Sequence, residues 1–451
     1  MLASATCDAA AAAATWSARA AIVCEWVRES WRAYHSAAAP RDTLAPVSRT
    51  GRDDFGALRA TAHDALDTLR LCRLEAEYAE ARALALGTAP SDAFVNVFET
   101  TIRVVGGLLG AVALDPDDAA LRDKAHELGA ALLPAFSDDG FVVSDVRMST
   151  GEARQAPWGA SSVSEAMLTP EFRTLSRLTG DARFARAAAA VADRLVALSD
   201  NGTRLLPVMW SRREGLTGDR ITLGARGDSY YEYLFKGGCV LGVEHECTAF
   251  RRAAAAIRDT LCARLDANAT FVDELVNGAR QPKMDHLVCF LPGTLAWAVH
   301  LGVLDDEYLR LAASVFETCR RMHDTPTGLA AEIAHRRGDG GGLRIAAADR
   351  HNLLRPETLE SAFWLWKATR DEHYRHASWR IVEAFATHAR APAGGGFCSV
   401  DDVLATPTTA CRDEMPSYWL AETLKYAYMT FADHDVGRRA VLSTEGHFLS
   451  D

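Results

Sequence analysis

The sequence lacks an excess of basic residues, because its 451 residues hold 49 Lys and Arg against 60 Asp and Glu, a formal net charge of −11. A protein that binds nucleic acid through phosphate contacts needs a basic face, so this balance argues against that class. Hydrophobic residues make up 49% and charged residues 24% of the chain. This composition is typical of a folded protein with a sizeable core and excludes disorder as the dominant state.

Signals for targeting or anchoring are also missing. No run of about 18 apolar residues free of charge is present, so the sequence predicts no membrane-spanning helix. The Ala-rich stretch 1–26 contains Asp8, Arg19 and Glu25. It lacks a basic region followed by a clean hydrophobic segment, so no signal peptide is visible. We expect a disordered tail over residues 1–20 and a single domain over residues 21–451.

Cysteine is sparse, with ten residues and no Cys-x-x-Cys spacing. This argues against a disulfide scaffold and gives a structural zinc site little support. Two glycosylation sequons begin at Asn201 and Asn268. They would matter only in a secretory compartment, and such triplets are common by chance.

A two-helix pattern recurs along the chain. An apolar helix ends in an acidic turn and an Ala- and Arg-rich helix follows, most clearly in residues 172–198 around Asp181. Similar turns lie near positions 115, 245, 305, 371 and 433, and a shorter copy lies at residues 71–78. About seven such hairpins fit either an open solenoid or a closed ring. No linker-like composition interrupts the period, which favours one closed α/α toroid, and the better strand candidates are residues 141–143 and 394–400.

Two segments place carboxylates on one face of an apolar helix. Glu99 and Arg103 are one helical turn apart, a spacing that is equally typical of a surface ion pair. Glu357 and Glu360 follow Pro356 at a predicted helix start, where the helix dipole alone favours acids. Both pairs therefore fit a structural role as well as a site.

Three further polar residues adjoin apolar segments. Asp228 precedes an aromatic stretch and is also consistent with a helix N-cap. Glu422 lies within the apolar stretch 418–426, where a buried carboxylate needs a partner or a shifted pKa. His286 opens another apolar helix and also fits a satisfied core histidine. If these residues lie at corresponding ends of successive hairpins, a closed ring would gather them around a cavity suited to a sugar or a hard cation.

At these same residues the sequence resembles glycoside hydrolase family 47, the class I α-1,2-mannosidases that trim N-glycans. The resemblance implies an all-α (α/α)7 barrel, a Ca²⁺ ion at the bottom of its cavity and an inverting hydrolase of the endoplasmic-reticulum type. An inverting site needs two carboxyl groups about 6.5–9.5 Å apart, with room for water between them. The matching stretches are residues 64–69, 97–103, 106–109, 175–181, 224–234, 283–293, 349–358, 420–426 and 444–447.

The resemblance also implies roles for individual residues. Glu357 is expected to be the general base, and either Glu99 or Asp228 the general acid. Thr444 is expected to bind Ca²⁺ through its hydroxyl and carbonyl oxygens, which suit a hard cation, with Glu445 acting through water. The residues expected to bind substrate or to line the water shell of the ion are Arg103, Glu165, Arg226, His286, Glu360, Tyr418 and Glu422.

Specificity and compartment follow from the same resemblance. Arg226 stands where the endoplasmic-reticulum type carries an arginine, which implies removal of one mannose from a nine-mannose glycan. The one disulfide that the family shares implies a bond between Cys289 and Cys319, and hence an oxidising compartment. We expect the other eight cysteines to be free. The expected partner is a high-mannose N-glycan on a glycoprotein in the lumen of the endoplasmic reticulum or Golgi, with membrane attachment only through an anchor outside this sequence.

The chain departs from the family pattern at three places. Residues 37–48 lack the usual Trp-Gly pair, the segment after Glu165 is one residue shorter with Pro170 at a helix start, and Tyr418 replaces a phenylalanine. The same fold also serves glycan-binding degradation factors with weak or no hydrolysis, which is the alternative function. The cysteine pair and Arg226 favour the trimming enzyme.

Overall fold

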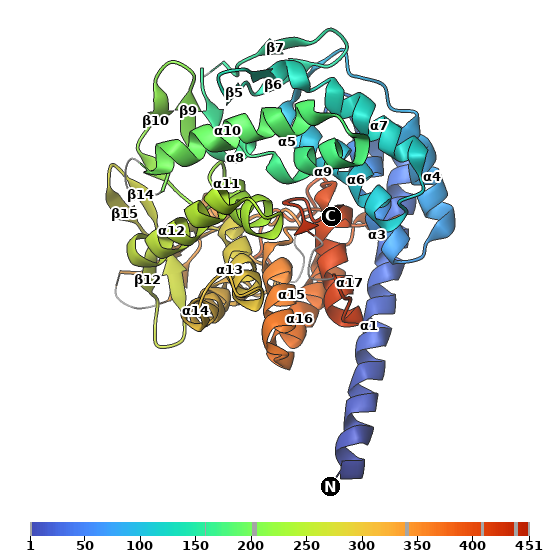
Figure 1. Ribbon diagram of the computed structural model, residues 1–451. Coiled ribbons are helices and arrows are strands. Elements are labelled where there is room, and N and C mark those ends of the chain that lie inside the picture. The colour runs from blue at the N-terminus through green and yellow to red at the C-terminus, as the bar shows by residue number, and fades with distance from the viewer. Residues whose placement is uncertain are drawn as a thin grey trace.

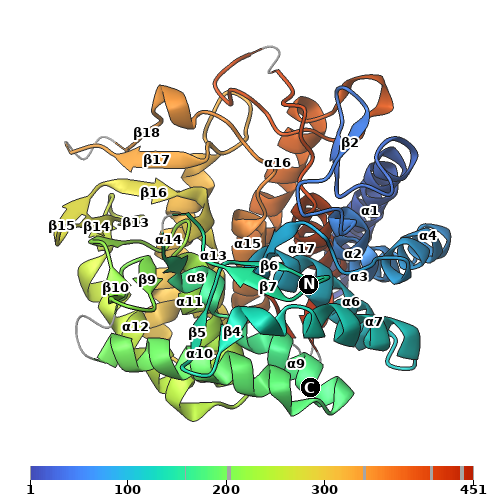
Figure 2. The same ribbon diagram turned by 90° about the horizontal axis from the view of Figure 1, so that it is seen from above.

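The computed structural model describes residues 2–157, 159–200, 205–338, 342–406, 410–436 and 441–449, with side chains from Thr15 onward except that of Asp200. The sequon at Asn201 lies outside the described residues. Within them the chain forms helices that alternate between an inner and an outer ring, as Figure 2 shows.

The outer ring is formed by helices with one buried face. In α14, for example, Tyr308, Ala312 and Val315 are buried while Asp306, Glu307 and Arg310 are not. This spacing is the stripe that a helix presents to a core. The outer helices of the described chain are α1 (Leu2–Ala37), α4 (Glu75–Leu86), α7 (Ala119–Ala130), α10 (Ala182–Asp200), α12 (Glu244–Thr260), α14 (Asp306–Met322) and α16 (Glu372–His388).

The inner ring is formed by segments that are buried on nearly all sides, as in the run Phe290–Ala298. A helix that is apolar all round belongs in a core. The inner segments are α2 (Ala60–Asp64) with α3 (Leu66–Leu71); α5 (Val97–Glu99), η1 (Thr100–Val105) and α6 (Gly106–Leu114); α8 (Val163–Ala166) with α9 (Thr169–Thr179); α11 (Asp228–Tyr233) with η3 (Leu234–Val240); η4 (His286–Cys289) with α13 (Phe290–His300); α15 (Glu357–Thr369); and η7 (Trp419–Thr423) with α17 (Leu424–Ala432).

The ring is closed. Inner helices α13, α15 and α17 pack side by side, and α1 at the beginning of the chain packs against α17 near its end. The prediction of a closed ring rather than an open solenoid is therefore confirmed. Six of the seven predicted turns connect an inner segment to an outer helix, whereas the next described element after the turn at Asp433 is strand β19 and not a helix. Several end the helix in the left-handed conformation, as at Gly180 (φ 73°), Arg370 (φ 59°) and Asp433 (φ 48°).

At the opposite end of the barrel, longer connections carry small antiparallel sheets. The strand predicted at residues 141–143 is present, whereas residues 394–400 form only single bridges, Arg390 with Phe397 and Asn352 with Val400. The sheets are β1 (Thr43–Ala45) with β2 (Thr50–Arg52); β3 (Phe94–Asn96), β6 (Asp145–Arg147) and β7 (Glu152–Arg154); β4 (Phe136–Ser137) with β5 (Phe141–Val142); β8 (Ser161–Ser162), β9 (Met209–Ser211) and β10 (Gly215–Thr217); β11 (Arg220–Ile221), β14 (Glu274–Val276) and β15 (Ala279–Gln281); β12 (Cys262–Arg264) with β13 (Thr270–Val272); and β16 (Lys283–Asp285), β17 (Ile333–Arg336) and β18 (Leu343–Arg344).

A short C-terminal hairpin lies among the inner helices. Its strands β19 (Val441–Leu442) and β20 (Phe448–Leu449) pair antiparallel and contact η3, α6 and α9. Its turn places Thr444 and Glu445 on the inside of the ring. The hairpin therefore forms the floor of the space that the inner helices enclose.

The N-terminal helix departs from the sequence expectation. A tail was expected over residues 1–20, but α1 begins at Leu2, and its first turns extend beyond the barrel (Figure 1). Trp16 is 4% exposed and stacks on Phe431, with ring centroids 5.6 Å apart. The packed part of the chain therefore begins by residue 16, before the expected boundary at residue 21.

Four disulfide bonds correct the cysteine prediction. Cys289–Cys319 is present as expected, but Cys24–Cys72, Cys239–Cys247 and Cys398–Cys411 are bonded as well. Six of the eight cysteines expected to be free are therefore paired. Among the described side chains only Cys262 is unbridged, and Cys7 lies outside them.

One described helical stretch, Val97–Leu114, is long and apolar enough to cross a membrane, although none was expected because Glu99 and Arg103 interrupt it. In the structure 83% of this stretch is buried inside the protein. Its apolar character is that of an inner-ring helix.

Candidate active site

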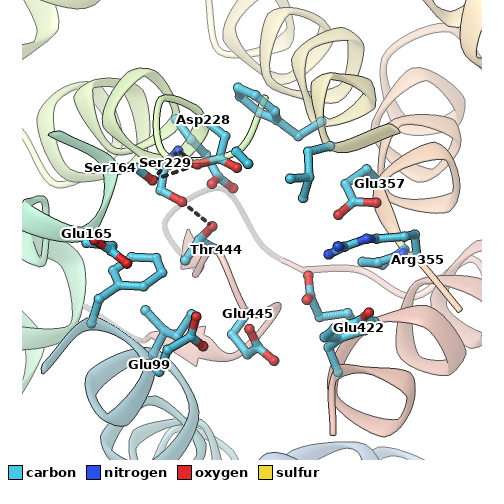
Figure 3. A pocket seen from close by; sticks show the side chains of 18 of the residues that line it. Glu99, Ser164, Glu165, Asp228, Ser229, Arg355, Glu357, Glu422, Thr444 and Glu445 are labelled. Atoms are coloured by element: carbon cyan, nitrogen blue, oxygen red, sulfur yellow. Dashed lines mark hydrogen bonds between the residues drawn. The ribbon is translucent and has the colours of Figure 1, made fainter. Parts of the chain in front are cut away.

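The inner helices enclose a cavity of about 250 Å³ above the C-terminal hairpin (Figure 3). Eight carboxylates face three arginines around it. Every residue that the sequence analysis assigned to a site lines this cavity except His286. The lining residues are Phe98, Glu99, Ile102, Arg103, Ser164, Glu165, Ala225, Arg226, Asp228, Ser229, Glu232, Leu287, Phe290, Arg355, Pro356, Glu357, Glu360, Tyr418, Glu422, Thr444 and Glu445.

Three of the inner helices contain π-helical turns at the cavity. They are η1, which follows Glu99; η3, which follows α11; and η7, which contains Glu422. A π-helical turn inserts a residue into the α-helical hydrogen-bond ladder and is frequent at functional sites. The departures from regular helix therefore cluster where the polar residues lie.

Glu357, in the first turn of α15, is held by a histidine behind it. His286 Nδ1 lies 2.8 Å from Glu357 Oε2, and His286 Nε2 lies 2.9 Å from Thr358 Oγ1. Burial opposes ionisation of Glu357, but the hydrogen bond with His286 and the positive charge of Arg355 outweigh it and hold the pKa below its usual value. His286 thus orients Glu357 from behind. It does not line the cavity, which was the position expected for it.

Asp228, at the first position of α11, has a pKa shifted in the opposite direction to that of Glu357. Burial raises its pKa to about 7, although the Ser164 hydroxyl and the Ser229 N–H donate to Oδ1 at 2.6 and 2.8 Å. The negative charges of Glu232 and Glu357 add to the rise. Asp228 therefore holds a proton more readily than Glu357. The two side chains enter the same cavity from different sides (Figure 3).

Glu99 forms the ion pair that its spacing predicted. Arg103 Nε donates to Glu99 Oε2 at 2.8 Å, and Arg103 Nη1 donates to Glu445. Arg103 therefore connects the wall of the cavity to its floor. The Asn96 side chain accepts from the Glu99 N–H at 2.9 Å and caps the helix that carries both residues.

The side of the cavity formed by α15 and η7 carries carboxylates with few cations. Burial raises the pKa of Glu360 to about 8, helped by the charges of Glu232 and Glu357 and opposed by Lys236. Burial and the neighbouring Glu445 and Glu357 place the pKa of Glu422 well above its usual value. Among the described residues no hydrogen-bond donor to the Glu422 carboxylate is present, and only 6% of the residue is exposed. Such a group requires a cation, a proton or a polar ligand.

Thr444 lies at the floor among these carboxylates. Its N–H donates to the Tyr233 hydroxyl at 3.0 Å, and its Oγ1 lies 3.1 Å from Ser229 Oγ. No described group donates to its carbonyl oxygen. Hydroxyl, carbonyl and carboxylate oxygens are the donors that a hard cation prefers, so the predicted position of Thr444 beside Glu445 fits Ca²⁺.

Arg226 and Glu165 lie at the wall formed by the loops. The Ser162 side chain caps α8 by accepting from the Glu165 N–H at 3.0 Å, and its hydroxyl donates to Glu165 Oε2 at 2.8 Å. Arg226 Nη1 lies 3.6 Å from the same oxygen, and 43% of the arginine side chain is exposed. The backbone of Arg226 has φ 75°. The loop thus holds an arginine at the rim.

The ring of Tyr418 lies between two guanidinium groups. Those of Arg103 and Arg355 are 5.6 and 5.4 Å from its centroid. The Tyr418 hydroxyl donates to the Leu353 carbonyl at 2.7 Å, a bond that phenylalanine would not form. Glu332 accepts from Arg355 Nε at 2.9 Å. The ring is therefore held rigidly, as a stacking surface requires.

Several cavity residues were not predicted from the sequence. Arg355 lies two residues before Glu357, and Glu232 lies one turn after Asp228, a spacing that could have revealed it. Ser164 and Ser229 carry no such signal, because isolated serines are common on any helix. The apolar lining residues Phe98, Ile102, Leu287 and Phe290 read as core residues in the sequence.

A second group of buried charges lies on the other side of the hairpin. Asp64, Asp67, Lys425 and His447, here called the anchoring cluster, are each 0% exposed. Lys425 Nζ donates to Asp67 Oδ2 at 2.8 Å and to the Gly446 carbonyl at 2.7 Å, and His447 lies 3.0 and 3.2 Å from Asp64 and Asp67. Burial works against ionisation of the aspartates, but His447 and Arg103 lower the pKa of Asp64, and Lys425 and His447 lower that of Asp67. The cluster fixes the hairpin to α2, α3 and α17.

Three side chains that could share a metal ion lie elsewhere. Asp193, His245 and Glu246 meet on the outer helices α10 and α12. Both oxygens of the buried Glu246 accept from Arg173, and calcium prefers oxygen ligands to imidazole. This group does not fit the expected calcium site, whereas the floor around Thr444 does.

Known proteins match nearly the whole barrel. The endoplasmic reticulum mannosyl-oligosaccharide 1,2-alpha-mannosidase of Rattus norvegicus is 40% identical over 427 residues, which cover 91% of this chain. The chain spans 64% of the length of that relative. The protein of the same name from Schizosaccharomyces pombe is 34% identical over 92% of this chain and 85% of the yeast protein.

A solved structure supports the fold independently. The alpha-1,2-mannosidase from Trichoderma reesei matches with a TM-score of 0.87 at 26% identity, covering 96% of this chain and 99% of that one. Its fold is the (α/α)7 barrel, so the predicted fold class is confirmed. The model of "Glycosyl hydrolase family 47" matches residues 26–451. With the family match, the related sequences and the barrel in agreement, the chain belongs to glycosyl hydrolase family 47.

Proposed function

We propose that the protein is an inverting, calcium-dependent exo-α-1,2-mannosidase that removes terminal α-1,2-linked mannose from high-mannose N-glycans. One observation carries this proposal: two carboxyl groups in one cavity, Asp228 and Glu357, have pKa values shifted in opposite directions. Such a pair is what general acid–base cleavage of a glycosidic bond requires.

Asp228 is the better candidate for the general acid. With a pKa of about 7 it retains its proton near neutral pH and can donate it to the departing glycosidic oxygen. Glu99 remains the other candidate. Its carboxylate is engaged by Arg103 at 2.8 Å, which leaves it acting through water.

Glu357 is the candidate base. Its lowered pKa keeps the carboxylate ionised, so that it can accept a proton from the attacking water. His286 and Thr358 fix its orientation from behind. Because water attacks the face of the sugar opposite the leaving oxygen, the product has inverted configuration.

The residues at the floor fit a calcium ion. Thr444 would bind it through its hydroxyl and carbonyl oxygens, with Glu445 and Glu422 reaching it through water. When bound, calcium supplies the positive charge that the cluster of carboxylates lacks and holds sugar hydroxyls by their oxygens. The fit rests on the unpaired Glu422 carboxylate and the open Thr444 carbonyl described above.

The substrate follows from the relatives and the rim. Arg226 and Glu165 lie where a second sugar would meet the protein, and Tyr418 offers a ring for stacking on the mannose. We propose that Arg226 restricts cleavage to one mannose of a nine-mannose glycan. Four disulfides and the relatives named for the endoplasmic reticulum support a luminal site of action.

A degradation factor that binds glycans without cleaving them is the second candidate. It would use the same cavity, but it has no need for an acid and a base with separated pKa values. The retained pair Asp228 and Glu357 therefore favours the enzyme.

The test is purified full-length protein incubated with a nine-mannose N-glycan, with and without EDTA. We expect loss of one hexose, an inverted product by NMR and no reaction with EDTA. Removal of several hexoses would contradict the role of Arg226. Calcium-dependent binding without release of mannose would overturn the enzymatic proposal in favour of the binding factor.

A further inference from the structure

Thr444 is held from one side by a single helix. Ser229 and Tyr233 lie one turn apart on α11, and both point toward the C-terminal hairpin. The hydrogen bonds that the described residues make to the Thr444 hydroxyl and N–H come from these two side chains. The helix that begins with Asp228 therefore also holds the floor of the cavity.

The direction of these hydrogen bonds can be worked out from the chemistry of each group. The Thr444 N–H is a donor, so the Tyr233 oxygen accepts from it at 3.0 Å. The one hydrogen of Tyr233 then points to Glu171 Oε1, with which it forms a short hydrogen bond. Tyr233 and Glu171 are both 0% exposed, so this chain of bonds is shielded from water.

Ser229 has a complementary effect on the Thr444 side chain. A hydroxyl that offers its lone pairs to a cation must donate its hydrogen to another acceptor. Ser229 Oγ lies 3.1 Å from Thr444 Oγ1 and is in position to accept it. The Thr444 carbonyl is left without a described donor, so both oxygens of this residue are free to face the cavity.

We propose that Ser229 and Tyr233 are positioning residues that set the Thr444 oxygens for calcium, and that Glu171 holds Tyr233 in the required orientation. This inference rests on the proposed function, because it takes Thr444 as the calcium ligand. It adds that α11 links the ion to the candidate acid Asp228. Residues that orient metal ligands from behind typically change metal affinity 10- to 100-fold when removed.

The experiment uses full-length protein stripped of metal and titrated with calcium by isothermal calorimetry. The variants are Tyr233→Phe and Ser229→Ala. The matched control is Tyr231→Phe on the same helix, whose hydroxyl likewise accepts a backbone N–H, that of Leu206 at 3.0 Å, away from the hairpin. Tyr233→Phe and Tyr231→Phe thus both lose a bond from a backbone N–H to a tyrosine hydroxyl.

We expect the calcium Kd to rise about 10-fold or more in Tyr233→Phe and Ser229→Ala and to stay within about twofold of wild type in Tyr231→Phe. Because Ser229→Thr retains a hydroxyl, it should bind calcium with nearly wild-type affinity. At saturating calcium the kcat of Tyr233→Phe and Ser229→Ala should approach that of the wild type, since the acid and base are intact.

Three results would count against the inference. Unchanged affinity in both test variants, or an equal loss in Tyr231→Phe, would reduce the contacts to a structural role while the proposed function stands. Wild-type protein that binds no calcium would overturn the metal site, and with it this inference. The melting temperature without calcium, measured for each variant, separates a loss of fold from a loss of affinity.

Discussion

Two groups of buried charges flank the C-terminal hairpin, and they behave in opposite ways. In the anchoring cluster, Asp64 and Asp67 meet Lys425 and His447 at hydrogen-bond distance, and their pKa values are lowered. In the cavity, burial and the charges of neighbouring carboxylates raise the pKa values of Asp228, Glu360 and Glu422, and the cation beside Glu360, Lys236, lies 3.4 Å away and is shared with Glu232. The partners differ: the protein supplies close cations to the first group of charges and leaves the second to be completed by a ligand.

Glu357→Gln gives the largest expected effect on the cavity side. The amide cannot accept the proton of the attacking water, so kcat should fall about 10³-fold or more while the fold is kept. Release of mannose and the circular dichroism spectrum are the measurements. Turnover near the wild-type rate would remove Glu357 from the role of base.

On the other side of the hairpin, Lys425→Met should be severely destabilising. It leaves Asp67 buried without its cation, and breaking a buried ion pair from one side costs about 3–5 kcal/mol. Urea unfolding of metal-free protein measures the change. Glu422→Gln is the matched variant in the cavity, and it should not destabilise the metal-free protein, because the raised pKa favours a neutral carboxyl group, which the amide resembles. Equal losses in both variants would erase the distinction between the two groups.

Calcium should stabilise the protein by completing the cavity charges. At a concentration 100 times its Kd, a ligand that binds only the folded state adds about 2.7 kcal/mol. Thermal melting with calcium and with EDTA should therefore differ by several degrees. Magnesium, which loses its water reluctantly, should give a smaller shift. Identical melting curves in calcium and EDTA would contradict a site at the floor.

The pH dependence of metal-free protein separates the two groups again. Because the folded pKa values of Asp228 and Glu360 are raised to about 7 and about 8, stability should fall as pH rises from about 4 to 8. The lowered pKa values of Asp64 and Asp67 give a contribution that is present above their unfolded pKa of about 3.9 and is lost in more acid solution.

Urea unfolding at pH 5 and pH 8 measures this dependence. The free energy of unfolding should be lower at pH 8, and Asp228→Asn should reduce the difference. A free energy that rises between these values would contradict the raised pKa values of the cavity.

Much of the fold was predictable, because the hairpin turns recur at a regular spacing along the sequence and this spacing indicates a ring of helix pairs. The wall residues Glu99, Asp228, Glu357 and Glu422 drew attention because each carboxylate adjoins or lies within an apolar segment, but their roles in a site came from the family resemblance. Their gathering into one cavity needed the closed ring. Local sequence offers no basis for pairing Cys24 with Cys72, 48 residues away, because the two meet only when α1 packs against α3.

The same limit applies to contacts across the barrel. The bonds of Ser229 and Tyr233 to Thr444 join residues more than 200 positions apart. His286 was assigned to the cavity because its motif adjoins the site, but the ring points it at the back of Glu357. Tertiary packing decided these details, since nothing in the neighbouring residues distinguishes a side chain that lines a cavity from one that supports it.

The position of the hairpin sets the order in which the site is assembled during synthesis. Glu99 leaves the ribosome some 350 residues before Glu445, and at about 5–20 residues per second that interval lasts about 20–70 s. During this time Arg103 lacks Glu445, one of its three carboxylate partners, and the inner helices that form the walls are added one after another before the floor. The floor of the cavity is therefore completed in one late step, when the last strands enter the barrel.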